Sequence, residues 1–397
     1  MSSSIITLGE KSNKLLYPLL ASISHFLYEI GNLLLSKKAN NSNGLGKHEF
    51  VLSWILFLSE AIIIFLYFLE TKLSKLSKNC NEQTNFLFSF LLILLCFILH
   101  FLLNIVPIFF SLEFTKNDLL DFIINILSMI SMSIFSIFIL HYKYYQHHFI
   151  GVLIVFIGII IHALFLSSEH LPNTFLNSIL IIIIYVISSL IEVIEKYLID
   201  IQYINPYLII SLQGIIGVVV IGILLLIFNN IPCPKEASFC EKEKMIEDFN
   251  ETMRILFSNK ESIIGIILMF FGICGFNIFR MKTIQIYSPT HRVLTNIITS
   301  FLHWIFVDLI FYNYFEMKLT DTLEIIIVKL ISYFISLIGL SIFLEIIIIN
   351  AFNLNRNTNK AITERIDKEL EPNLLEAILN EPINDLIENE RNNSLMF

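Results

Sequence analysis

The segment NIFRMKTIQIYSPTHRVLTNIITSFLHW, residues 277–304, joins two apolar runs through a short basic turn at Ser288 and Pro289. The second run carries polar side chains among apolar ones: His291, Arg292, Asn296, Thr299 and His303. An Arg side chain in hydrocarbon costs about 2.5 to 3.5 kcal/mol on insertion scales, so such residues normally face a partner or a cavity. We therefore expect the rest of the chain to frame these residues within a membrane.

The composition of the chain supports a membrane protein. Of its 397 residues, 56% are hydrophobic and only 15% are charged, and the mean hydropathy is +0.75. A membrane helix needs about 20 mostly apolar residues, and the sequence offers about ten such runs. The net charge of -8 reflects an acidic C-terminal segment, and we expect no nucleic-acid partner. These features predict an all-α polytopic membrane protein.

The apolar runs divide the chain into two halves of similar plan. Residues 15–166 contain the spans near 15–36, 50–69, 86–111, 117–140 and 149–166, and residues 167–350 contain those near 175–197, 206–228, 263–283, 290–312 and 323–350. An odd number of spans per half inserts the second half upside down, and inverted repeats are typical of transporters. We predict ten transmembrane helices in two inverted five-helix repeats, with a cytoplasmic segment 1–14, a lumenal loop 229–260 and an acidic cytoplasmic tail 351–397.

The short loops favour cytosolic N- and C-termini, because Lys and Arg are more frequent on that side. The loop 229–260 then lies on the lumenal or external side. There Cys233 and Cys240 either form a disulfide or remain two free thiols, and Asn250 begins a candidate glycosylation sequon. Residues 245–257 have apolar positions at helical spacing, which predicts an amphipathic helix on the membrane surface.

Three stretches resemble the drug/metabolite transporter superfamily, including its EamA-like members. They are FNIFRMKTIQIYSPTHR with the helix up to Trp304, EKYLIDIQYINPYLIISLQGIIG (195–217) and KHEFVLSWILFLSE (47–60). The nearest branch is the F-type, nucleotide-sugar-transporter-like branch of solute carrier family 35. The resemblance covers residues 15–350 and implies ten helices around a central cavity that moves small metabolites. Residues matching the family motifs are His48, Phe50, Glu60, Glu195, Lys196, Asn277, Thr290, Arg292 and Trp304.

The chain departs from this family pattern at several charged positions. Asn296 and Thr299 stand where an acidic and a second basic residue are usual, and Gln213 replaces an acid. Asp121, Ile124 and Asn125 occupy a region where the family has Gln followed by Arg. Anionic sugar nucleotides need fixed cationic partners, so we expect a neutral or zwitterionic metabolite instead.

We predict that the substrate-binding residues are Glu60, His100, Asn277, Arg292, Asn296 and Thr299. Glu60 either lines the cavity or pairs with another buried polar group, and it is a candidate for proton coupling. Arg280, Lys282 and Arg292 are interpreted as positive-inside anchors, although Arg292 could also reach an anionic substrate. His100 and His162 could relay protons, but we favour packing roles for both.

The sequence also allows two other classes of function. The segment HYKYYQHH (141–148) resembles part of the histidine clusters that hold iron in membrane desaturases, but the other histidines are scattered singly. We therefore expect no enzyme, no metal and no cofactor, and we interpret this segment as an interfacial turn. The alternative to a transporter is a non-transporting membrane scaffold or receptor.

The expected partners are a small-molecule substrate and the lipid bilayer. The sequence is also compatible with a homodimer. The expected location is an endomembrane of Golgi, endosomal or lysosomal type, or the plasma membrane. No feature of the sequence chooses between these compartments.

Overall fold

The computed structural model describes residues 16–37, 49–74, 86–109, 118–166, 175–233, 245–258, 260–310 and 323–349, with residues 358, 361 and 365. Every regular element within these ranges is a helix, as the composition predicted, and they contain no strand. The chain divides into two compact units, residues 1–143 with 155–337 and residues 144–154 with 338–397.

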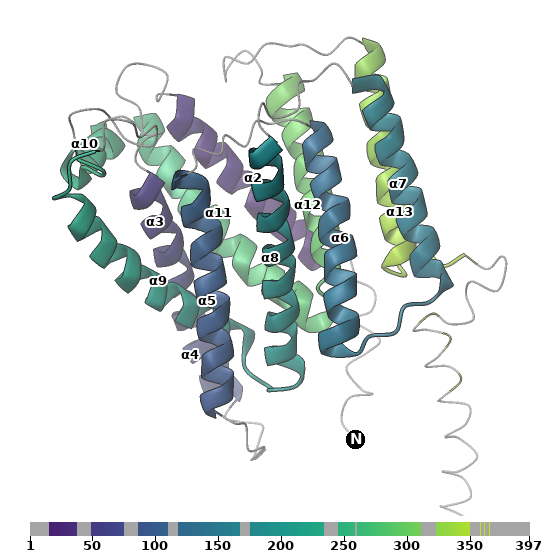
Figure 1. Ribbon diagram of the computed structural model, residues 1–397, viewed down its shortest axis with the longest axis horizontal. Coiled ribbons are helices and arrows are strands. Elements are labelled where there is room, and N and C mark those ends of the chain that lie inside the picture. The colour runs from purple at the N-terminus through teal and green to yellow at the C-terminus, as the bar shows by residue number, and fades with distance from the viewer. Residues whose placement is uncertain are drawn as a thin grey trace, which may run out of the picture. The chain divides into compact units, whose positions relative to one another are not determined.

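The helices follow the apolar runs of the sequence (Figure 1). They are α2 (Leu16–Lys37), α3 (Glu49–Ala61), α4 (Ile64–Ser74), α5 (Phe86–Phe109), α6 (Asp118–Leu140), α7 (Gln146–Leu166), α8 (Phe175–Asp200), α9 (Pro206–Phe228), α10 (Phe249–Ser258), α11 (Lys260–Ile286), α12 (His291–His303), the π-helix η4 (Trp304–Ile310) and α13 (Leu323–Phe343).

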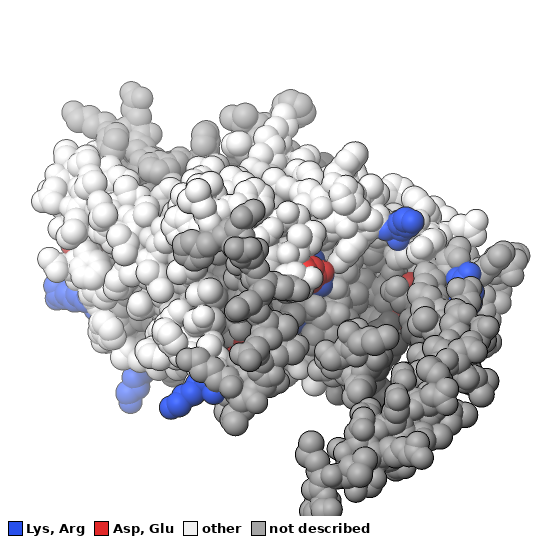
Figure 2. Space-filling view, turned by 90° about the horizontal axis from the view of Figure 1, so that it is seen from below, with Lys and Arg blue, Asp and Glu red and all other residues white. Residues whose placement is uncertain are grey.

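Five described helical segments are long and apolar enough to cross a membrane: Glu49–Lys72, Leu87–Ile108, Pro206–Phe228, Lys260–Ile286 and Glu324–Phe343. Their outer surfaces are apolar, since Leu87 and Leu226 are each 72% exposed and Phe271 is 66% exposed. On the face shown in Figure 2, few of the described atoms belong to charged residues. An apolar exterior of this extent suits lipid rather than water.

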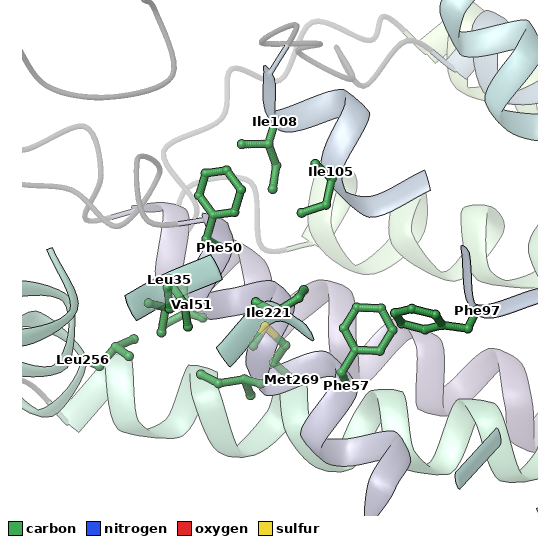
Figure 3. Packing of buried hydrophobic residues seen from close by; sticks show 12 residues of the cluster. Leu35, Phe50, Val51, Phe57, Phe97, Ile105, Ile108, Ile221, Leu256 and Met269 are labelled. Carbon is green, nitrogen blue, oxygen red and sulfur yellow. The ribbon is translucent and has the colours of Figure 1, made fainter. Parts of the chain in front are cut away.

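The larger unit is built from helix pairs in which one helix comes from each half of the sequence. Helix α2 packs against α11, α3 against α9, and α6 against α8. One apolar cluster joins α2, α3, α5, α9, α10 and α11, and Figure 3 shows the Phe57 and Phe97 rings next to each other in it. Their centroids are 6.1 Å apart in an edge-to-face arrangement, which is favourable for aromatic pairs.

Two spans that the sequence predicts as continuous α-helices depart from α-geometry. The predicted helix 50–69 is interrupted at Ile62 and Ile63, where the Ile63 N–H binds the Glu60 carbonyl three residues back. The predicted helix 290–312 becomes a π-helix from Trp304. Short departures of both kinds occur often at functional sites in helical proteins.

The predicted surface helix at 245–257 is helical only from Phe249, as α10, and much of its apolar face is covered by protein. Leu256 is buried, and Phe249 and Met253 pack against the same apolar cluster. Phe257 is 66% exposed and faces outward. This helix therefore closes one end of the apolar cluster, which the sequence pattern alone could not distinguish from a membrane contact.

The smaller unit contains the start of α7 and the end of α13. At Gly151 an added Cβ would lie 2.7 Å from the Gly339 carbonyl oxygen, so the two helix backbones touch there. The last predicted span, 323–350, ends as an α-helix at Phe343, and Glu345 has a positive φ of 56°.

Candidate functional site

Glu60 is the central residue of a buried polar group. It lies one residue before the end of α3 and is only 4% exposed. The Asn277 amide on α11 donates a hydrogen bond of 3.1 Å to Glu60 Oε1. Glu60 Oε2 is buried and has no hydrogen-bond partner among the described residues. The carboxylate thus has one hydrogen bond and a second oxygen that the described part of the chain leaves unused.

Two further side chains complete this group, which we name the Glu60 group: Glu60, His100, Gln213 and Asn277. His100 Nδ1 on α5 lies 4.0 Å from Glu60 Oε1, and Gln213 on α9 lies close enough to the His100 ring to interact with it electrostatically. Gln213 is 2% exposed. The four side chains come from four different helices, and each helix belongs to a span that can cross a membrane.

Helix α9 approaches Glu60 closely because its residue at the crossing is glycine. A Cβ added at Gly214 would lie 2.7 Å from the Glu60 carbonyl carbon and 2.7 Å from the Glu60 Cβ. No larger residue fits without a shift of one backbone. The close approach of α9 to α3 at Gly214 therefore brings the neighbouring Gln213 near Glu60.

A second buried network consists of two Arg–Glu pairs. Arg280 on α11 donates two hydrogen bonds to Glu195 on α8, at 2.7 and 3.2 Å, in the bidentate geometry that suits guanidinium and carboxylate. Glu192, one turn earlier on α8, pairs with Arg292 on α12 and lies 3.5 Å from Arg280. Both carboxylates are fully buried. The network therefore ties together α8, α11 and α12.

This network changes the interpretation of two predicted anchors. Arg280 is only 8% exposed, and Arg292 is bound to Glu192 and to the Ser188 hydroxyl at 3.1 Å. Neither guanidinium faces an interface as a positive-inside anchor would. Lys282 fits that role better, because it pairs at 3.3 Å with the partly exposed Glu70.

The predicted residues Asn296 and Thr299 are not linked to Glu60 by any described interaction. The Thr299 hydroxyl is hydrogen-bonded to the Thr295 carbonyl at 2.9 Å and to the Ser22 carbonyl at 3.4 Å. Ser22 in turn donates to the Thr295 carbonyl. Thr299 therefore fastens α12 to α2, and Asn296 is half-buried on the same helix.

The structure adds detail to the other candidate residues. Cys233 is disulfide-bonded, and its predicted partner Cys240 lies outside the described residues. Asn250 is exposed on α10, as glycosylation requires, while Thr252 of the same sequon is buried and donates to Glu247. The side chains of Asp121, Ile124, Asn125 and His162, and all of residues 1–15, also lie outside the described part.

The structure brings a distant carboxylate to the segment HYKYYQHH. Glu345 lies 3.0 Å from His147 Nε2, although the two residues are 198 positions apart. No spacing rule links them, so the sequence could not reveal this pair.

Compared with known proteins, the sequence matches no family model and no curated protein.

Proposed function

We propose that the protein is a secondary transporter that moves a small polar metabolite across a membrane by alternating access. The observation that carries the proposal is the Glu60 group, a set of polar side chains gathered from four apolar spans. Ionisable residues inside a membrane are costly and usually mark a substrate or ion pathway. The resemblance of the sequence to the drug/metabolite transporter superfamily points the same way.

The pattern of helix contacts supports two repeats of five spans. Pairing the helices of the two halves in order matches α2 with α8, α3 and α4 with α9, α5 with α11, and α6 with α12. Under this exchange the contact of α2 with α11 becomes that of α8 with α5, and the contact of α6 with α8 becomes that of α12 with α2. Both members of each couple are present, as expected for a repeated architecture.

The Glu60 group has the same two-fold character. The exchange moves Glu60 on α3 to the helix of Gln213, and His100 on α5 to the helix of Asn277. The group as a whole therefore uses two pairs of equivalent helices and lies where the two repeats meet. Substrate and coupling-ion sites of transporters with inverted repeats lie at this interface, often beside an interrupted helix. The span of α3 and α4 is interrupted at Ile62 and Ile63, two residues after Glu60.

The charges around the group favour a neutral or zwitterionic substrate and a proton as the coupling ion. Arg280 and Arg292 are both engaged with Glu192 and Glu195, so both of these guanidinium groups already have carboxylate partners and are not free to bind a phosphate. Glu60 belongs to neither of these Arg–Glu pairs. A lone carboxylate in an apolar span is stabilised when it takes up a proton, so Glu60 can carry one proton per transport cycle.

Uptake by purified protein in liposomes tests the proposal. A metabolite pool is screened by mass spectrometry with and without an imposed pH gradient, and wild type is compared with Glu60→Gln and with Glu70→Gln. Glu70 is a matched control, because it lies on the same span and is half exposed. We expect accumulation that depends on the pH gradient in wild type and Glu70→Gln and loses this dependence in Glu60→Gln.

Each other outcome has a definite meaning. Transport by Glu60→Gln with an unchanged pH dependence would remove proton coupling through Glu60. If correctly folded protein accumulates no compound, the result would favour the alternative of a non-transporting scaffold or receptor. The two buried Arg–Glu pairs are also compatible with that alternative.

The proposed setting is an endomembrane or the plasma membrane, with both termini cytosolic. In that orientation residues 1–14 and 351–397 lie in the cytosol, and the Cys233 disulfide lies in an oxidising compartment. The two predicted repeats, 15–166 and 167–350, are part of the same proposal.

A further inference from the structure

Two adjacent histidines and one distant glutamate form a compact cluster in the smaller unit. His147 and His148 lie in the first turn of α7, and Glu345 follows the end of α13. One ligand atom from each of the three residues lies within 4.8 Å of the other two. His147 and Glu345 are 4% and 6% exposed. Imidazole nitrogen and carboxylate oxygen are ligands that Zn²⁺ accepts in proteins.

The backbone at Glu345 is held in an unfavourable conformation. Its φ of 56° lies in the left-handed region. Helices that end in this conformation usually have glycine there, and for other residues the conformation costs about 1 to 2 kcal/mol. The turn is closed by N–H groups of residues 346 and 347, which both bind the Ser341 carbonyl. Strained residues of this kind concentrate at functional sites, and here the strained residue contributes the carboxylate of the cluster.

One ring nitrogen of the cluster has no hydrogen-bond partner among the described residues. His147 Nε2 is 3.0 Å from Glu345 Oε1, and His147 Nδ1 is buried with no hydrogen-bond partner among the described residues. The lone pair of His148 Nδ1 accepts a hydrogen bond of 3.0 Å from the Tyr145 N–H, so an ion bound at this nitrogen would replace that hydrogen bond. A buried ring nitrogen without a partner is uncommon and points to a ligand such as an ion.

We propose that His147, His148 and Glu345 bind a divalent transition-metal ion, with Zn²⁺ as the best fit. Ligand atoms in a tetrahedral zinc site with bonds near 2.0 to 2.2 Å lie about 3.4 Å apart, close to the His147–Glu345 separation of 3.0 Å. The imidazole rings of His147 and His148 have their centroids 4.0 Å apart, so small rotations bring both toward one ion. Two His and one Glu leave a fourth position for water or for a further ligand.

The absence of thiols among the three donors argues against Cu(I), and the two imidazoles argue against Mg²⁺ and Ca²⁺, which prefer oxygen ligands. A bound ion would connect the N-terminus of α7 to the C-terminus of α13. This site is separate from the Glu60 group and does not depend on the proposed transport.

Metal titration of the purified full-length protein tests the proposal. The protein is stripped with a chelator, and Co²⁺ is added while the visible absorption of tetrahedral Co²⁺ is followed, with Zn²⁺ as a competitor. We expect one equivalent of Co²⁺ to bind and Zn²⁺ to displace it. His147→Ala should weaken Zn²⁺ binding at least about 10-fold, because loss even of a residue behind a ligand costs about 10- to 100-fold.

Two variants separate loss of the ligand from loss of the fold. Glu345→Gly removes the carboxylate and places glycine where the backbone favours it, so it should fold as well as wild type and still bind Zn²⁺ at least about 10-fold more weakly. His141→Ala is the matched control, since His141 belongs to the same segment, is exposed and lies outside the cluster. Wild-type affinity in His147→Ala and in Glu345→Gly, or no metal bound by wild type, would overturn the proposal.

Discussion

Removal of the Arg280 guanidinium is the most direct test of the buried ion network. The variant Arg280→Met keeps most of the side-chain volume but leaves Glu195 without either of its hydrogen bonds of 2.7 and 3.2 Å. Glu195 is fully buried, so water cannot replace the lost partner. Breaking a buried pair by removing one partner costs about 3 to 5 kcal/mol. At about 1.4 kcal/mol for each factor of ten, the unfolding equilibrium shifts by roughly 100- to 4,000-fold.

The assay is reversible unfolding in mixed detergent micelles, followed by far-UV circular dichroism at fixed detergent composition. Lys282→Met is the control, because Lys282 lies on the same helix and pairs with a partly exposed carboxylate, and an exposed pair contributes at most about 1 kcal/mol. The double variant Arg280→Met with Glu195→Met should recover much of the loss, since an apolar pair avoids the unpaired charge. A loss for Arg280→Met no larger than that for Lys282→Met would refute this reasoning.

Three further predictions concern packing, capping and the disulfide. Gly214→Ala should lower the free energy of unfolding by about 1 to 3 kcal/mol through overpacking against Glu60, whereas Gly222→Ala, whose Cβ would have 3.6 Å of space, should stay within about 1 kcal/mol of wild type; equal effects in the same unfolding assay would contradict the close α3–α9 contact. Asn205→Ala should cost about 0.5 to 2 kcal/mol in that assay, because the Asn205 side chain caps α9, and an unchanged stability would show that the cap is dispensable. Cys233 should resist alkylation until a reductant is added, as measured by peptide mass spectrometry, and modification without reductant would argue against the disulfide.

Hydropathy alone located the helices well, because burial in lipid requires long apolar runs whatever their partners. The span 206–228 has the predicted limits, with Pro206 at its first turn and Asn205 as its cap. The interruption at Ile62 and Ile63 was missed, since neither residue is Gly or Pro and both are apolar. At this turn α9 comes very close to the backbone, since a Cβ added at Gly214 would clash with the Ala61 nitrogen.

The candidate site was predicted in part. Glu60, His100 and Asn277 were identified, because each is polar within an apolar span, and they do lie together. Arg292 was assigned to an anchor or a substrate, yet it pairs with Glu192 from another helix. The sequence shows how far each polar residue lies from the ends of its apolar span. It does not show which residues of the neighbouring helix face it, so it could not show which charges are already paired.

The same limit explains why the sequence did not reveal the cluster of His147, His148 and Glu345. His147 and His148 belong to the segment HYKYYQHH, whereas Glu345 lies within the predicted span 323–350, which gave no reason to connect it with the histidines. A left-handed residue at a helix terminus is predictable when it is glycine, and here it is glutamate. Only the fold shows that this turn carries a carboxylate to the histidines.

The contact between α2 and α11 determines which parts of the larger unit can move independently. A Cβ added at Gly31 would lie 2.6 Å from the Gly265 carbonyl oxygen, and one added at Gly272 would lie 2.5 Å from the Tyr28 nitrogen. Backbones meshed this closely along an antiparallel seam cannot slide past one another without separating first. We therefore expect α2 and α11 to move as one body, so that in the proposed transport cycle the larger unit would bend at other helix contacts and Asn277 on α11 would move relative to Glu60.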